Sequence, residues 1–85
     1  MRIDLHGLPL SEAKIKSQIS VAEAWSKSIS SIELIHGYHL GNVIKDYIQD
    51  EDGLRRDIGS IYPEVSVLKL KDKGLGATMI SFRRD

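Results

Sequence analysis

Residues 2–7 read RIDLHG and residues 32–37 read IELIHG, so two short apolar runs of one chain both end in His-Gly. Residues 2–5 and 31–35 are each typical of a short buried strand. Between them, after Pro9, apolar residues recur at nearly 3.6-residue spacing, which predicts an amphipathic helix over residues 10–28. A strand, helix, strand connection makes the two strands parallel and neighbouring. We therefore expect His6 and His36 to lie together at one edge of a sheet.

The periodic apolar positions of this helix predict the side that faces the core. These positions are Leu10, Ile15, Ile19, Ala22, Trp25 and Ile29. The other side carries Lys, Ser, Gln and Glu, which is typical of a solvent-exposed surface.

The rest of the chain predicts a second helix from Gly41, a further short helical segment in LRRDIGSIY, and two strands. Alternation favours a strand over residues 64–71, residues 72–76 have turn chemistry, and ATMISF, residues 77–82, forms the last strand. This βαβαββ order predicts an α/β (α+β) two-layer sandwich with a mixed four-stranded sheet. If the third strand is parallel to the first two, the turn with Gly74 and Gly76 lies at the His-Gly edge. Ligands bind at this carboxyl edge of open α/β sheets.

Composition limits the class of protein. The 85 residues contain no cysteine, which excludes disulfides and thiolate metal sites, and 12 basic residues balance 12 acidic ones. No apolar run approaches the ~20 residues of a membrane span, and the opening MRIDL lacks the longer apolar core of a signal peptide. We expect a single cytoplasmic domain over residues 1–85, monomeric and without a membrane partner.

Three motifs in order resemble those of the Smr (small MutS-related) domain family. They are IDLHG at residues 3–7, IHGYHLG at residues 35–41 and GLGATMISF at residues 74–82, and the likeness extends from Arg2 to about Arg83. The chain is identified as a small stand-alone member, and the resemblance implies the same βαβαββ sandwich. It also implies nucleic-acid binding and, as in several members, nicking or endonuclease activity on DNA or RNA, with some members acting on ribosome-associated messages.

The family's implicated residues carry over to Asp4, His6, Gly7, Gly37 and Gly41. The second motif departs from the family pattern in one respect. Many nucleolytic members have a second glycine two positions after the first, where this chain has His39. That departure weakens the case for close backbone approach at this loop and for full nuclease activity.

The candidate catalytic residues are Asp4, His6, His36 and His39. Asp4 and His6 are two residues apart, so on a strand their side chains leave the same face and could share a proton. Histidine titrates near ~6.5 and suits proton transfer at neutral pH. In the alternative interpretation, Asp4 accepts a loop hydrogen bond and His6 is structural. A His/Asp metal site is a competing use, so no cofactor is established and Mg²⁺ stays open.

The candidate residues for nucleic-acid or phosphate binding are glycines, lysines and one tyrosine near the same edge. They are Gly7, Gly37, Tyr38, Gly41, Lys69, Lys71, Lys73, Gly74 and Gly76. Gly41 precedes a helix whose first amides could hold phosphate, and Tyr38 could stack on a base. Residues 66–84 carry five basic side chains and one acidic side chain. In the alternative interpretation, the lysines only keep an edge strand soluble.

These observations predict a nucleic-acid-binding endonuclease that nicks DNA or cleaves RNA. RNA or single-stranded or branched DNA is favoured, because no helix is rich in base-reading side chains. The alternative is a noncatalytic nucleic-acid or ribosome-associated adaptor.

Overall fold

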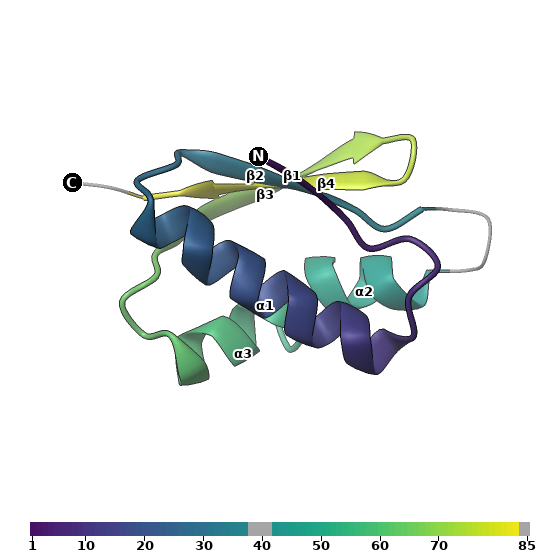
Figure 1. Ribbon diagram of the computed structural model, residues 1–85, viewed down its shortest axis with the longest axis horizontal. Helices are drawn as coiled ribbons and strands as arrows, with labels where there is room; N and C mark the ends of the chain where they lie inside the picture. Colours follow the sequence, from purple (N-terminus) through teal and green to yellow (C-terminus); the bar gives the residue numbers. More distant parts are fainter. Residues whose placement is uncertain (38–41, 84–85) are drawn as a thin grey trace.

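The computed structural model describes residues 1–37 and 42–83, with the backbone alone at Leu68. Its elements are β1 (Arg2–Asp4), α1 (Leu10–Ser26), β2 (Ser31–Ile35), α2 (Val43–Gln49), α3 (Leu54–Ile61), β3 (Val67–Gly74) and β4 (Ala77–Phe82). Figure 1 shows two layers, with the strands in one and the three labelled helices in the other. The expected α+β sandwich is confirmed. In the described part of the chain, no helix is long and apolar enough to cross a membrane.

The strand order is β1-β2-β4-β3. β1 pairs with β2 in parallel, with Ile3 opposite Leu34, while β4 is antiparallel to both β2 and β3. β3 therefore runs parallel to β1 and β2, and the sheet is mixed. As expected, the β3–β4 turn lies at the edge where β1 and β2 end.

The core lies between the helices and one face of the sheet. Leu34 and Ile80, from the two central strands, are fully or almost fully buried, and Ile48 and Leu54 cover them from the helical layer. Trp25 packs edge-on against Phe82, with ring centroids 5.7 Å apart. These apolar contacts hold β4 and the helices in register with the ends of β1 and β2.

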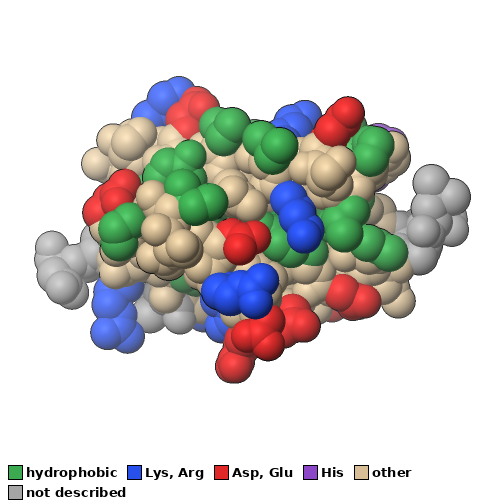
Figure 2. Space-filling model, turned by 90° about the horizontal axis from the view of Figure 1, so that it is seen from below, with side chains coloured by type: hydrophobic (Ala, Val, Ile, Leu, Met, Phe, Trp, Pro, Cys, Tyr) green, Lys and Arg blue, Asp and Glu red, His purple; other side chains and the backbone are tan. Residues whose placement is uncertain are grey.

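The side of α1 that faces the core matches the expected one only in part. Leu10, Trp25 and Ile29 pack against the core as expected. Ile15 and Ile19 are 59% and 52% exposed, whereas Ser17 and Ser20 are buried. Small side chains let the helix approach its neighbours closely, and Ser17 Oγ donates a hydrogen bond to Lys14 O at 3.0 Å, so burial leaves its hydroxyl paired. Figure 2 shows apolar side chains interspersed with charged ones on the helical side of the molecule.

The third strand begins later than predicted. Residues 64–66 precede β3, and Val65 is buried with its N–H donating to Tyr62 O at 3.0 Å. β3 then continues to Gly74, with register shifts against β4 between Val67 and Lys69 and between Asp72 and Gly74. Such bulges break the strict alternation on which the prediction relied.

A polar network joins the three helices. Tyr47 Oη in α2 donates to Asp57 Oδ2 in α3 at 2.7 Å, and Gln18 Nε2 in α1 donates to Tyr47 Oη at 2.8 Å. Burial, followed by the hydrogen bond to Asp57, raises the pKa of Tyr47. The phenol therefore stays neutral and keeps the proton that it donates.

Candidate nucleic-acid site

Three loops meet at the carboxyl edge of the sheet. Leu5 N donates to Ile35 O at 2.7 Å, which ties the end of β1 to β2. The amides of His36 and Gly37 both donate to Gly76 O, at 2.8 and 3.0 Å, which ties β2 to the β3–β4 turn. Gly7, Gly37, Gly74 and Gly76 all have φ between 70° and 77°, the left-handed region that favours glycine. We call this edge, defined by these four residues, the glycine rim.

The two His-Gly motifs touch each other at the glycine rim. A Cβ added at Gly37 would lie 3.2 Å from the Cβ of His6. The lack of a side chain at Gly37 therefore lets the β1 loop pack against the end of β2. The repeated His-Gly reflects this packing as well as the turn that each glycine makes.

Asp4 and His6 form an exposed pair at the end of β1. Asp4 Oδ1 is hydrogen-bonded to His6 Nδ1 and also accepts the backbone N–H of His6 at 3.1 Å. The His6 and Asp4 side chains are 66% and 56% exposed. The two side chains that spacing placed on one face therefore meet in a position open to solvent.

The Asp4 carboxylate fixes the tautomer of the His6 imidazole. Hydrogen bonds from His6, first from the ring and then from the backbone N–H, lower the pKa of Asp4. An ionised carboxylate only accepts hydrogen bonds, so Nδ1 of neutral His6 must carry the proton and Nε2 keeps its lone pair. Among the described residues, His6 Nε2 has no hydrogen-bond partner. His6 is thus oriented by Asp4 with a basic nitrogen free.

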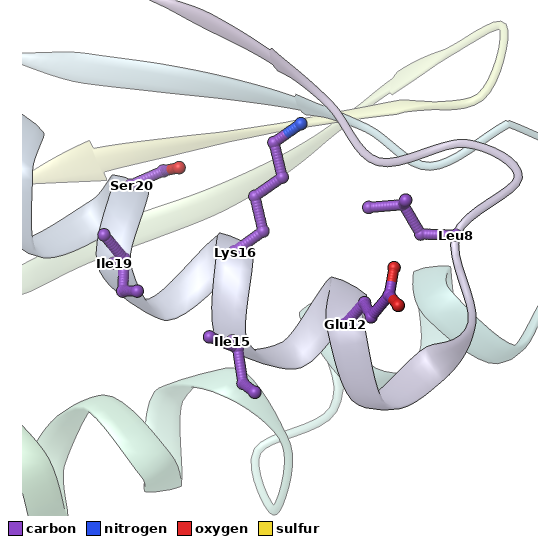
Figure 3. A pocket seen from close by; sticks show the side chains of 6 residues that line it. All are labelled: Leu8, Glu12, Ile15, Lys16, Ile19 and Ser20. Carbon is purple, nitrogen blue, oxygen red and sulfur yellow. The ribbon is translucent and has the colours of Figure 1, made fainter.

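A lysine from α1 reaches the same pair. Lys16 Nζ donates to the backbone oxygen of Asp4 at 3.1 Å, and its charge contributes to the lowered pKa of Asp4. Figure 3 shows Lys16 extending from α1 toward the strands, while Ile15 points away from them. Lys16 also lines an apolar hollow of about 380 Å³ that includes Leu8, Ile15 and Ile19. The site thus has a cation beside Asp4.

His36 is placed differently from His6. It is only 6% exposed, and both ring nitrogens are engaged, Nδ1 with Gly37 O and Nε2 with Thr78 Oγ1, each at 2.9 Å. Because a carbonyl only accepts, Nδ1 carries the proton and Nε2 accepts from the Thr78 hydroxyl. Thr78 Oγ1 in turn accepts from Gln49 Nε2 at 2.8 Å. The structure therefore does not bring His36 into the open site, because both of its ring nitrogens are engaged. Its catalytic role stays a prediction.

The predicted binding residues comprise the lysines of β3 and the glycines of the rim, with further residues in the second motif. Lys69, Lys71 and Lys73 are exposed along β3, the strand at the opposite edge of the sheet from β1. Gly74 N donates to Asp72 Oδ1 at 2.8 Å, so this amide is already occupied. Tyr38, His39 and Gly41 lie outside the described residues.

The residues between Ile3 and Arg83 match the sequence model of the Smr domain family. The chain belongs to the Smr family. It is also similar in structure to the Smr domain of Thermus thermophilus MutS2, with a TM-score of 0.69 and 23% identity over 98% of each chain. No curated protein matches it in sequence. The resemblance inferred from the three motifs is therefore confirmed, and the family is known for nucleic-acid binding.

The Smr domain offers two metal-ligating side chains at the rim, Asp4 and His6. Within residues 1–37 and 42–83, no three His, Cys, Asp or Glu side chains come together to hold a metal ion. Asp4 and His6 already bind each other, so a Mg²⁺ ion there would have to take most of its oxygen ligands from water and substrate.

Several side chains around the Smr site carry no clear signal in the sequence. Lys16 lies on a helix whose polar residues looked like an ordinary solvated surface, and nothing in its spacing points to Asp4. Thr78 and Gln49 complete the surroundings of His36. The Gly-x-Gly-Ala-Thr motif contains Thr78, but only its hydrogen bond with His36 Nε2 shows that it reaches the second motif.

Proposed function

We propose that this Smr domain is an endonuclease that binds nucleic acid at the glycine rim and cleaves a phosphodiester bond with the Asp4–His6 pair. The observation that carries the proposal is the exposed imidazole whose Nδ1 is held by an ionised carboxylate. This leaves Nε2 as a general base on the solvent side. Family membership supports nucleic acid as the substrate class.

The reaction needs one proton to move twice. His6 Nε2 takes the proton of the attacking hydroxyl, either the RNA 2′-hydroxyl or water, as the oxygen forms its bond to phosphorus. The bond from phosphorus to the leaving oxygen then breaks, and the imidazolium returns the proton to that oxygen. Asp4 stabilises the imidazolium, and the Lys16 ammonium beside Asp4 favours the phosphate charge. This scheme uses one histidine and does not require His36.

RNA and single-stranded or branched DNA fit the site better than a base-specific duplex. Within residues 1–37 and 42–83, the site is a sheet edge with an exposed pair of side chains, and no helix there is suited to reading base edges. We propose a cytoplasmic protein whose substrates include ribosome-associated RNA, bound by a monomer.

The decisive test compares wild type with Asp4→Asn and His6→Ala on labelled single-stranded RNA, duplex DNA and branched DNA, each with and without Mg²⁺. General acid–base catalysis is worth about 10² to 10⁴ in rate, so each variant should lose cleavage by that factor. Binding should change little, because affinity rests on phosphate contacts. Asp4→Asn is the sharper variant, since an amide replaces the carboxylate with little change in size.

The pH profile adds a second measurement. With one histidine that must start as the neutral base, the rate should rise with pH near ~6 to 7 and then level off, whereas two histidines that exchange protons would make it rise and fall there. Wild-type rates in both variants would remove the pair from the chemistry. Binding without cleavage by wild type on every substrate would favour the noncatalytic adaptor, an alternative consistent with the engaged nitrogens of His36.

A further inference from the structure

A second hollow, lined mainly by polar side chains, lies at the edge of the sheet opposite the Asp4–His6 pair. It has a volume of about 480 Å³ and is lined by Gln49 of α2, Arg55 of α3, and Lys69, Leu70 and Asp72 of β3. β1 and β3 are the two edge strands, three strand spacings or roughly 14 Å apart. The hollow is therefore separate from the site that holds His6.

Arg55 carries a buried donor without an acceptor. Its Nε is buried, and no described residue accepts a hydrogen bond from it. The only hydrogen bond of its guanidinium within the described residues joins Nη2 to Gln49 O at 3.5 Å, the outer limit for such a bond. A buried charged donor without a hydrogen-bond acceptor costs free energy. An acceptor for Arg55 Nε from outside the described residues would remove that cost.

The charges around the hollow favour an anion. Asp72 is its one acidic lining residue, and that carboxylate is already engaged by the Gly74 amide at 2.8 Å and Lys45 Nζ at 3.4 Å. Within residues 1–37 and 42–83, neither Arg55 nor Lys69 forms an ion pair. Two cations thus line one hollow, and the nearby Asp72 carboxylate is engaged by other partners.

We infer that this hollow, the Arg55 subsite, binds a phosphate group of a nucleic-acid strand whose neighbouring phosphates extend to the glycine rim. A guanidinium presents Nε–H and Nη–H as a planar fork that fits two phosphate oxygens, and Lys69 adds a point charge. The inference rests on the proposed function for the identity of the strand. It adds a contact with Arg55 that is independent of the cleavage chemistry.

The first experiment measures the affinity for fluorescein-labelled single-stranded RNA by anisotropy over a range of salt concentrations. Arg55→Gln should weaken binding about tenfold, as expected for one charge-assisted hydrogen bond, and should reduce the log-log salt slope by about 0.7. Lys69→Gln, at an exposed position, should reduce the slope by a similar amount.

Arg56→Gln is the matched control. Arg56 is the next residue of α3, is exposed, and does not line the hollow, yet its replacement removes the same charge. Equal losses of RNA affinity in Arg55→Gln and Arg56→Gln would show that the effect comes from net charge alone, and would overturn the inference. Circular dichroism of Arg55→Gln checks its folding, and an unchanged slope in Lys69→Gln would overturn the inference even if Arg55→Gln unfolds.

The second experiment separates the subsite from the proposed cleavage. The Arg55 Nε–H resonance is followed by NMR in titrations with inorganic phosphate, a nucleoside monophosphate and a short single-stranded RNA, using the full chain. The RNA should shift this resonance at concentrations at least tenfold below those of the two small molecules. A shift with the small molecules alone would make the site one for free phosphate and overturn the inference. A shift with RNA that wild type never cleaves would support the subsite while the proposed function fails.

Discussion

Gly37 shows how a missing side chain can position a reactive one. Its φ of +76° strains any other residue, and its contact with His6 leaves no room for an added Cβ without movement of the β1 loop. Gly74 has a similar φ of +70° but open space around it. A comparison of substitutions at the two glycines therefore separates the effect of backbone strain from the effect of the contact with His6.

We predict that Gly37→Ala and Gly74→Ala each lose about 1 kcal/mol of stability, because alanine is strained in the left-handed region. Only Gly37→Ala should also displace the His6 imidazole, since its new methyl group meets His6 Cβ. Thermal unfolding measures the first effect, and the NMR titration of His6 measures the second. Identical His6 titrations in the two variants would show that Gly37 acts through the turn alone.

Sequence could identify both histidines but could not distinguish their roles. His6 and His36 have the same local motif, yet one is exposed beside a carboxylate and the other is buried against Thr78. The difference arises from a partner on β4, and pairing across the sheet cannot be read from the motif. Asp4 was identifiable because its partner is two residues away.

Among the elements, the junction between α2 and α3 depends on Gly53. A Cβ there would lie 1.9 Å from Tyr47 O, far inside van der Waals contact with backbone. Gly59, within α3, has open space around its Cβ position and does not have positive φ.

Gly53→Ala should therefore destabilise the protein by about 3 kcal/mol, near the upper end for overpacking, because backbone must move. Gly59→Ala should stabilise it by about 0.5 to 1 kcal/mol, since alanine favours a helix interior. Urea denaturation of both variants tests the pair. A small loss of unfolding free energy in Gly53→Ala would mean that the backbone of the α2–α3 junction moves at little cost.

Element types were predictable because each has a clear period or turn signal, but the orientation of α1 was predictable only in part. Apolar spacing selected Ile15 and Ile19, whereas close packing selected the small Ser17 and Ser20. Hydrophobicity alone does not predict the burial of a serine that fits a narrow space and whose hydroxyl is hydrogen-bonded. The late start of β3 has a similar cause, because bulges are set by pairing with β4.

For the molecule as a whole, acid should weaken folding through two exposed carboxylates. His6 lowers the pKa of Asp4, and the Gly74 amide, followed by Gln49, lowers that of Asp72. In the unfolded chain both titrate near the ordinary 3.8. Their stabilisation is therefore fully present above that pH and is lost as the pH falls through the lower folded values.

We expect Asp72→Asn to be less stable than wild type at pH 7, with the difference shrinking as the pH is lowered below about 4. Glu51→Gln removes the same charge from an exposed residue whose side chain has no hydrogen bond within the described residues, and should not show this convergence. Chemical denaturation at several pH values measures both. A constant difference between Asp72→Asn and wild type would contradict the linkage.

The central position of β4 has a consequence for biosynthesis. In the sheet that the described residues form, β2 and β3 are not paired with each other, and both pair with β4, where Ile35 and Gly74 are opposite Ala77. A nascent chain that has not yet released residues 77–82 from the ribosome can form the β1–α1–β2 unit but leaves β2 with an unpaired edge. The sheet should therefore close only after residues 77–82 have left the ribosome, in one step that joins both halves, and a ribosome that stalls before residue 77 would present an incomplete domain to chaperones and proteases.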